Sequence, residues 1–90
     1  MSIGELELFA AEIDENLPVL DLHGLYPAPA LDKLEVFLYN NFIKKERAVK
    51  IIYGIGSGEL EGAVSKQLTS HPLVRGFSKK AGYCIVTFEI

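Results

Sequence analysis

The residues best suited to catalysis lie in one short segment, from Val19 to Gly24, whose sequence is V-L-D-L-H-G. Side chains alternate along an extended strand, so Asp21 and His23 share one face while Leu20 and Leu22 share the other. A carboxylate beside an imidazole can orient it for general acid or base catalysis, or can help to hold a metal ion. A buried strand that ends in two solvated polar residues accounts for the same pattern. The pair alone therefore leaves both interpretations open.

A second segment, Gly54-Ile55-Gly56-Ser57-Gly58, could bind an anion. It lies between an apolar run and a helical pattern, and glycines let a backbone approach a phosphate at the N-terminus of a helix. The segment has neither the Gly-Lys-Ser/Thr of a P-loop nor the G-x-G-x-x-G spacing. Glu59 and Glu61 follow directly and can interact with the helix dipole in place of a phosphate. The alternative is a tight strand-to-helix turn that Ser57 or Gly58 caps.

Both segments, in this order and one helix apart, resemble the Smr (small MutS-related) domain. Leu20 to Gly24 resembles the leucine-aspartate-leucine-histidine-glycine motif of that family, and Gly54 and Gly56 resemble its glycine-x-glycine motif. The tail from His71 to Phe77 is similar to the type found at the C-terminus of MutS-like ATPases. The resemblance extends over roughly Leu17 to Ile90, which is most of the chain.

The resemblance implies that Asp21 and His23 take part in cleaving nucleic acid and that the glycine motif takes part in binding it. Three residues depart from the family pattern. Tyr53 stands where histidine is frequent, Ile55 where lysine is common, and Glu61 where arginine is common. Two cations are thus missing and one anion is gained, so we expect weaker contact with phosphate and weaker cleavage.

The contacts with nucleic acid are expected from backbone groups of the glycine turn and from basic side chains near the C-terminus. The residues predicted to make them are Gly24, Tyr53, Gly54, Gly56, Ser57, Gly58, Arg75, Lys79 and Lys80. Tyr26 could stack on a base, although a loop tyrosine that packs over the core is the more common arrangement. His71, before Pro72, is predicted to stop a helix. No metal site is predicted, and a divalent metal held by Asp21 is left open.

Length and composition indicate a single globular domain. The chain has 90 residues, of which 49% are hydrophobic, so a compact core is expected. No apolar run approaches the roughly 20 residues of a membrane span, and no signal peptide is expected. Cys84 is the lone cysteine and lies in an apolar stretch, which indicates neither a disulfide nor a zinc or thiolate site. A cytoplasmic location is expected.

Charge is distributed unevenly along the chain. Residues 1–16 carry five acids and no base, whereas the remainder carries nine bases and seven acids, a net charge of +2. Apolar residues recur at helical spacing from Ile3 to Ile13, so residues 1–16 are predicted to be an acidic amphipathic leader. Residues 17–90 form the Smr-like domain. A charge of +2 is a weak footprint for binding nucleic acid.

The remaining pattern predicts the order β-α-β-α-β-β. After the strand that starts at Val19, the predicted elements are a helix Pro29–Ile43, a strand Ala48–Tyr53, a helix Glu59–Ser70, a strand Val74–Phe77, a turn Lys79–Gly82 and a strand Tyr83–Ile90. Alternation in the last strand predicts that one face is buried. Right-handed crossovers place both helices on one face of a mixed four-stranded sheet, a two-layer α/β sandwich. The resemblance implies a similar architecture, like that of the C-terminal domain of translation initiation factor three.

We therefore predict an Smr-like domain that binds DNA or RNA, with strand nicking by phosphodiester hydrolysis as an open extension. The alternative is an adaptor that has lost cleavage and contacts a protein through the acidic N-terminal helix or a sheet edge. Contact with a membrane is not expected.

Overall fold

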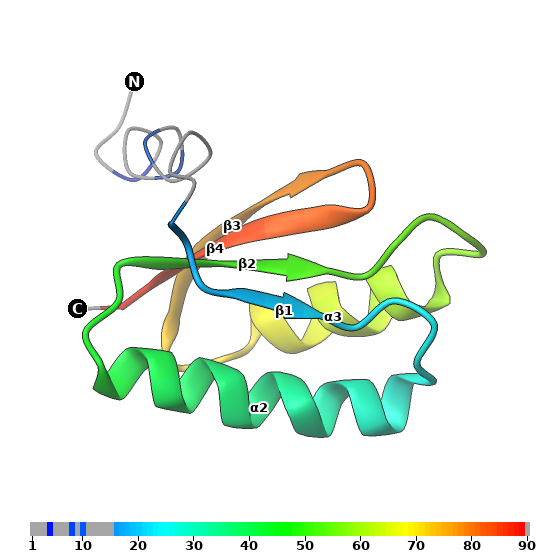
Figure 1. Ribbon diagram of the computed structural model, residues 1–90, viewed down its shortest axis with the longest axis horizontal. Helices are drawn as coiled ribbons and strands as arrows, with labels where there is room; N and C mark the ends of the chain where they lie inside the picture. The colour runs from blue at the N-terminus through cyan, green and yellow to red at the C-terminus, as the bar shows by residue number, and fades with distance from the viewer. Residues whose placement is uncertain (1–3, 5–7, 9, 11–15, 90) are drawn as a thin grey trace.

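The computed structural model describes Gly4, Leu8, Ala10 and residues 16–89 (Figure 1). Its elements are β1 (Val19–Asp21), α2 (Pro27–Ile43), β2 (Ala48–Ile52), α3 (Glu59–Thr69), β3 (Val74–Lys80) and β4 (Tyr83–Phe88). The predicted order of strands and helices is confirmed. Apart from the three residues named, the predicted helix from Ile3 to Ile13 lies outside the described residues, and the division of the chain at residue 16 stays a prediction.

The strands form one mixed four-stranded sheet in the order β1-β2-β4-β3. β1 and β2 are parallel, whereas β4 runs antiparallel to both β2 and β3. Both helices cover the same face of this sheet, so the predicted two-layer α/β sandwich is confirmed (Figure 1). Because β1 and β2 are parallel and adjacent, the loops that follow them leave the sheet at the same edge.

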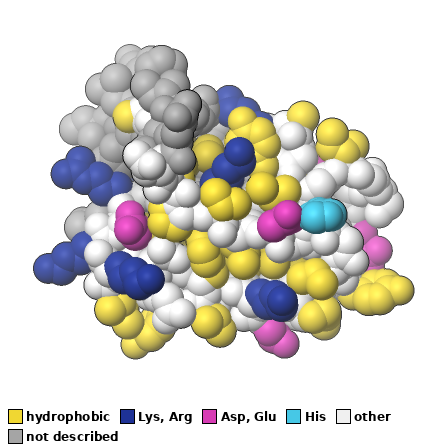
Figure 2. All heavy atoms as spheres, viewed as in Figure 1, with side chains coloured by type: hydrophobic (Ala, Val, Ile, Leu, Met, Phe, Trp, Pro, Cys, Tyr) yellow, Lys and Arg dark blue, Asp and Glu magenta, His cyan; other side chains and the backbone are white. Residues whose placement is uncertain are grey.

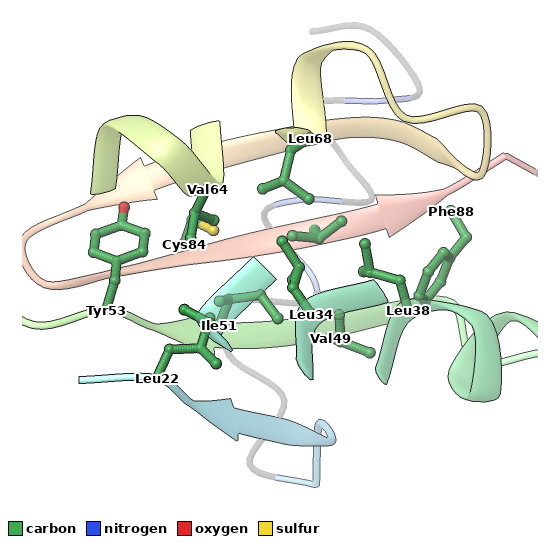
Figure 3. Close-up of a cluster of buried hydrophobic side chains, with 12 residues drawn as sticks. Leu22, Leu34, Leu38, Val49, Ile51, Tyr53, Val64, Leu68, Cys84 and Phe88 are labelled. Carbon is green, nitrogen blue, oxygen red and sulfur yellow. The ribbon is translucent and has the colours of Figure 1, made fainter. Parts of the chain in front are cut away.

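The core lies between the sheet and the two helices (Figure 3). α2 contributes Ala30, Leu34 and Leu38, which recur every four residues and so lie on one face of the helix. Each fully buried leucine stabilises the fold by roughly 1.5–3 kcal/mol. Phe42 and Phe88 meet edge to face, with 6.0 Å between their ring centroids. The inward face predicted for this helix is confirmed.

The first helix starts at Pro27, two residues earlier than predicted. Proline suits the first turn of a helix because that position needs no N–H donor. Tyr26, the residue before it, is extended with φ −71° and ψ 155°, as the residue before a proline prefers. The first strand, in turn, ends at Asp21, and Leu22 continues the pairing through one hydrogen bond from its N–H to the carbonyl of Ile52, at 2.7 Å.

The third strand is longer than predicted. It continues to Lys80, which pairs with Tyr83, so Lys79 and Lys80 lie on the strand and the turn contains only Ala81 and Gly82. Gly82 has a φ of +83°, which glycine adopts without the steric strain that other residues would have. The other predicted starts of strands and helices agree with the structure, and the other ends differ by at most two residues.

Both faces of the last strand are covered, so the prediction of a single buried face was wrong. Every residue of β4 after Tyr83 is buried. On the face that carries no helix, Ala48 and Ile85 form a small apolar cluster against which Leu8 and Leu17 pack, together with Tyr83. Leu8 and Leu17, which lie far from β4 in the sequence, thus cover part of the sheet face that the alternation of residues in β4 predicted to be exposed.

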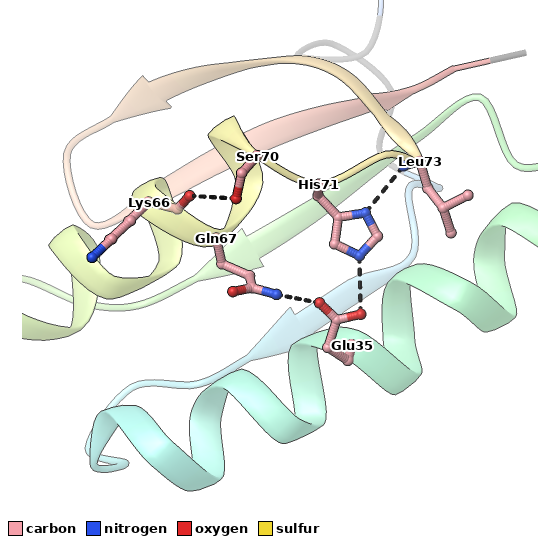
Figure 4. A network of polar contacts seen from close by, with 6 residues as sticks. All are labelled: Glu35, Lys66, Gln67, Ser70, His71 and Leu73. Carbon is pink, nitrogen blue, oxygen red and sulfur yellow. Dashed lines mark hydrogen bonds and ion pairs between the residues drawn. The ribbon is translucent and has the colours of Figure 1, made fainter.

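A polar network joins the two helices (Figure 4). The N–H of Leu73 donates to Nδ1 of His71 at 3.1 Å, so Nε2 of His71 carries the proton and donates to Glu35 Oε2 at 3.0 Å. Gln67 donates to the other oxygen of Glu35. Burial acts to raise the pKa of Glu35, but the hydrogen bonds from His71 and Gln67 outweigh it and hold that pKa below its usual range. His71 therefore follows the end of the helix, as predicted, and also ties α2 to the end of α3.

We expect His71→Ala to lower the free energy of unfolding by about 1–3 kcal/mol, because it leaves the Leu73 N–H and one Glu35 oxygen without their partner. Thermal melting measures this, at roughly 4–8 °C per kcal/mol for a domain of this size. The matched control is Ser70→Ala, whose hydroxyl makes only an exposed 3.4 Å hydrogen bond to the Lys66 carbonyl. Equal melting temperatures for the two variants would contradict this role for His71.

Among the helices that the structure describes, none is long and apolar enough to cross a membrane.

Candidate nucleic-acid site

Asp21 and His23 project together from the end of β1. The buried Leu22 between them points into the core and fixes the backbone, so the two polar side chains lie on the opposite side. Both are accessible to solvent, with 48% of the Asp21 side chain and 69% of the His23 side chain exposed. Figure 2 shows a histidine next to an acidic side chain at the molecular surface. The alternation of the side chains is as predicted, and their catalytic role stays a prediction.

The two side chains form a short hydrogen bond. Asp21 Oδ1 lies 2.6 Å from His23 Nδ1 and also accepts the His23 backbone N–H at 3.0 Å. The side-chain hydrogen bond from His23, followed by the backbone one, lowers the pKa of Asp21 below its ordinary value of 3.8. Asp21 is therefore a carboxylate at neutral pH, and it holds the proton of the neutral imidazole on Nδ1. The lone pair of Nε2 is then available to a substrate.

The glycine turn lies directly against His23. Gly54 has a φ of +78°, and a Cβ atom placed on it would lie 3.2 Å from the Cβ of His23. The N–H groups of Tyr53 and Gly54 both donate to the carbonyl of Gly82, at 3.0 and 2.9 Å, which anchors the turn to the hairpin between β3 and β4. The two sequence motifs are therefore neighbours at one edge of the sheet, as their positions after parallel strands predicted.

A hollow of about 170 Å³ lies beside this contact. Gly24 and Leu25 line it on one side and the turn from Tyr53 to Gly58 on the other, with Leu60 and Glu61 from the first turn of α3. Backbone groups of the glycine turn are thus exposed close to the imidazole, which is the arrangement that a bound phosphate requires.

Groups of the chain itself already interact with the N-terminus of α3. Gly58, with a φ of +88°, is the N-cap, and Ser57 Oγ accepts the Glu59 N–H at 3.3 Å. Glu59 and Glu61 occupy the first turn, where carboxylates interact favourably with the helix dipole. Lys79 forms a 4.0 Å ion pair with Glu61. The structure therefore contains the capping interaction of the alternative interpretation, and any phosphate would have to be held ahead of the cap, at Ile55 and Gly56.

Replacing Gly54 and Gly56, two of the three glycines of the turn, distinguishes an effect on folding from an effect on binding. We expect Gly54→Ala to destabilise the domain by roughly 1–2 kcal/mol, because a side chain is strained at its positive φ and crowds His23. Gly56 has no positive φ and open space around it. Gly56→Ala should therefore leave the melting temperature unchanged and weaken nucleic-acid binding, measured by fluorescence anisotropy. A folded Gly56→Ala variant with unchanged affinity would exclude Gly56 as a phosphate contact.

Two of the predicted contact residues are poorly placed to contact a ligand at the open site. Tyr53 is buried, its hydroxyl donates to the Tyr83 carbonyl at 2.9 Å, and burial raises its pKa to about 12. Its ring therefore belongs to the core. Arg75 lies at the start of β3, beside the pair formed by Val74 and Phe88, whereas Lys80 ends that strand near the glycine turn. Five residues of strand, about 17 Å, separate Arg75 from Lys80.

Two exposed apolar side chains near the hollow are unexpected. Tyr26 is 82% exposed, so the expectation that it packs over the core was wrong, and Ile55 is 85% exposed. Pro27 explains the first, because the extended Tyr26 that it favours points away from the helix. Only the Tyr26-Pro27 dipeptide gave a sequence signal for the exposure of Tyr26.

Within the described part of the chain, no three histidine, cysteine, aspartate or glutamate side chains gather closely enough to hold a metal ion.

Comparison with known proteins identifies relatives of this chain. Endonuclease MutS2 of Pelotomaculum thermopropionicum is 38% identical over 63 residues, which are 70% of this chain and 8% of that protein. The chain thus spans less than a tenth of the length of this relative. The Smr domain of Thermus thermophilus MutS2 shares the fold, with a TM-score of 0.79 at 22% identity over 82% of this chain and 100% of that one.

A second solved structure shows higher identity. The human small-MutS related domain is 35% identical, with a TM-score of 0.65, over 78% of this chain and 99% of that one. Residues 20–87 match the family described as the Smr domain, from the Leu20 that opens the first motif almost to the end of β4. The chain therefore belongs to the Smr domain family.

Proposed function

We propose that this domain binds nucleic acid and cleaves a phosphodiester bond at the Asp21–His23 pair. The observation that carries the proposal is the 2.6 Å contact between the two side chains, exposed to solvent and adjacent to the glycine turn. A carboxylate-oriented imidazole beside exposed backbone donors is suited to move a proton while a phosphate is held. The relative from Pelotomaculum thermopropionicum is named an endonuclease, in agreement with this chemistry.

In this proposal, His23 Nε2 removes a proton from the attacking hydroxyl, which is that of water or of a ribose. The oxygen attacks phosphorus, the bond from phosphorus to the leaving oxygen breaks, and the leaving oxygen takes up a proton from the His23 imidazolium or from water. Asp21 stays ionised, accepts a hydrogen bond from the Nδ1–H group throughout and stabilises the imidazolium that forms. The backbone N–H groups of Ile55 and Gly56 hold the phosphate oxygens, since that of Gly54 donates to the Gly82 carbonyl. Asp21 Oδ2 is the one oxygen of that carboxylate outside these hydrogen bonds, and a divalent metal that it helps to hold would polarise the phosphate.

The test is a nicking assay on supercoiled DNA, with a single-stranded RNA in parallel, each with magnesium and with a chelator. The proposal is supported if the native chain converts supercoiled DNA to open circles or shortens the RNA and the His23→Ala variant does neither. Absence of cleavage from every substrate, with and without metal, would contradict catalysis by this pair. If the native chain binds the substrates but cleaves none of them, its function is nucleic-acid binding without cleavage.

A protein-interaction domain is the second candidate, and an exposed stripe on α2 favours it. Val36, Tyr39 and Ile43 are spaced by three and four residues, so they lie along one face of the helix, and all three are exposed. Such a stripe is suited to contact another protein. The discriminating observation is binding of an oligonucleotide that weakens as salt rises, which the first proposal requires and the second does not.

We also propose a cytoplasmic location and a part in DNA repair or recombination. Cys84 is a buried free thiol, and burial raises its pKa to about 12, in agreement with a reducing compartment. The repair assignment follows from the likeness to MutS2 endonucleases. The repair assignment depends on the same cleavage assay.

A further inference from the structure

A row of side chains crosses the face of the sheet that carries no helix, level with the Asp21–His23 pair. Asp21 pairs with Ile52, Ile52 with Tyr83, and Tyr83 with Lys80. Residues paired across neighbouring strands project from the same face, so these four side chains form one continuous line from β1 to β3. Adjacent strands are about 4.8 Å apart, which makes the row roughly 14 Å long.

Cations flank the aromatic ring in this row. Lys50, two residues before Ile52 on β2, projects from the same face, and its Nζ lies 4.3 Å from the centroid of the Tyr83 ring. Lys80 neighbours Tyr83 on the other side, from β3. Both lysines and the ring therefore lie on one surface with the Asp21–His23 pair at its end. In Figure 2, basic side chains lie among hydrophobic ones on the surface of the sheet near this pair.

The rest of this face is already covered. Leu8 and Leu17 pack against Ala48, at the opposite end of β2, and against Ile85, which pairs with Lys50 in the middle of the sheet. Tyr83 borders the same cluster. The row from Asp21 to Lys80 is the part of the face next to the candidate catalytic residues. An incoming ligand that reaches His23 along the sheet must cross this row.

We propose that a single-stranded segment of nucleic acid binds across this row and leads into the Asp21–His23 site. A base stacks against Tyr83 as the Lys50 ammonium moves from the ring to a phosphate, and Lys80 binds the phosphate on the other side. A ring on an open sheet between cations is a known way of holding unpaired bases, whereas in a duplex the base faces are stacked on one another and closed to it. This inference rests on the proposed function and adds the strand type and its path.

The test is a binding assay of the full chain with fluorescein-labelled single-stranded DNA and RNA of about twelve nucleotides. Tyr83→Leu keeps an apolar side chain but removes the ring, and it should weaken binding by about 5- to 150-fold, the range for loss of one stacked base. Lys50→Gln and Lys80→Gln should each reduce the slope of log K against log salt concentration by about 0.7.

Matched controls lie on the helical side. Lys33→Gln and Lys66→Gln remove the same charge from α2 and α3, and Tyr39→Leu removes an exposed ring from α2. The proposal requires that these three leave affinity and salt slope nearly unchanged. Equal losses in the row and control variants would overturn it, because they would indicate attraction to the domain as a whole. Binding of the matching duplex with the same affinity and the same losses would overturn it as well.

Failure of this inference can be told from failure of the proposed function. Suppose that the native chain cleaves nucleic acid through His23 while the Tyr83, Lys50 and Lys80 variants bind as tightly as the native chain. The proposed function then stands, and the proposed path across the sheet is wrong. If the native chain binds no oligonucleotide, both are wrong. Because Tyr83 also packs against the Ala48–Ile85 cluster, each variant is first compared with the native chain by thermal melting. Should Tyr83→Leu not fold, the salt slopes of the two lysine variants decide the outcome.

Discussion

Replacement of His23 by alanine is expected to lower the rate of strand cleavage by about 10²- to 10⁴-fold, the usual contribution of a general acid or base. The melting temperature should not change, because the side chain is largely exposed and its hydrogen bonds are to Asp21. Cleavage and melting are measured on the same preparation. A large loss of stability with unchanged cleavage would show instead that the histidine is structural.

Asp21→Asn tests the other half of the pair. The amide keeps the size of the side chain but loses the charge that stabilises the imidazolium, so cleavage should fall while the affinity for nucleic acid is unchanged or rises. Asp32→Asn on α2 is the matched control, since it removes one exposed carboxylate that does not line the hollow. If both variants cleave like the native chain, Asp21 does not orient the catalytic base.

The position of the site could be predicted because it depends on local rules. Alternation along a strand places Asp21 and His23 together, and two parallel strands joined by a helix bring the loops after them to one edge of the sheet. Gly54 then contacts His23 although 31 residues separate them. The same rules predict the buried positions of α2. None of these inferences requires knowledge of distant side chains.

The features that could not be predicted depend on packing between distant segments. Glu35 and His71 hydrogen-bond across 36 residues, and neither has a local pattern that identifies its partner. Tyr53 was predicted to contact nucleic acid at the end of the second strand, but its ring is buried in the core. Arg75 was predicted to contact nucleic acid together with Lys79 and Lys80, whereas the direction of β3 places it at the other end of that strand. Contacts that close a sheet face, such as that of Leu8, likewise follow from the folded arrangement alone.

The last prediction concerns the acidic leader, residues 1–16. It carries five acids, and its Leu8 packs against Ala48 and Ile85 on the same face of the sheet as the proposed path of the strand. A unit charge 10 Å from a phosphate in water repels it by about 0.4 kcal/mol, so five such charges amount to on the order of 2 kcal/mol, or roughly thirtyfold in Kd. We therefore expect the leader to weaken nucleic-acid binding by its charge.

Deleting residues 1–15 should consequently strengthen oligonucleotide binding at low salt and have much less effect at high salt, where charges beyond about 10 Å are screened. The deletion should also lower the melting temperature, because the contact of Leu8 with the Ala48–Ile85 cluster is lost. Two variants separate these effects. Changing the five acids to their amides keeps Leu8 and should reproduce the gain in affinity alone, whereas Leu8→Ala keeps the charge and should reproduce the loss of stability. Equal affinity of the deletion and the native chain at both salt concentrations, from a well-folded protein, would show that the leader does not compete with phosphates.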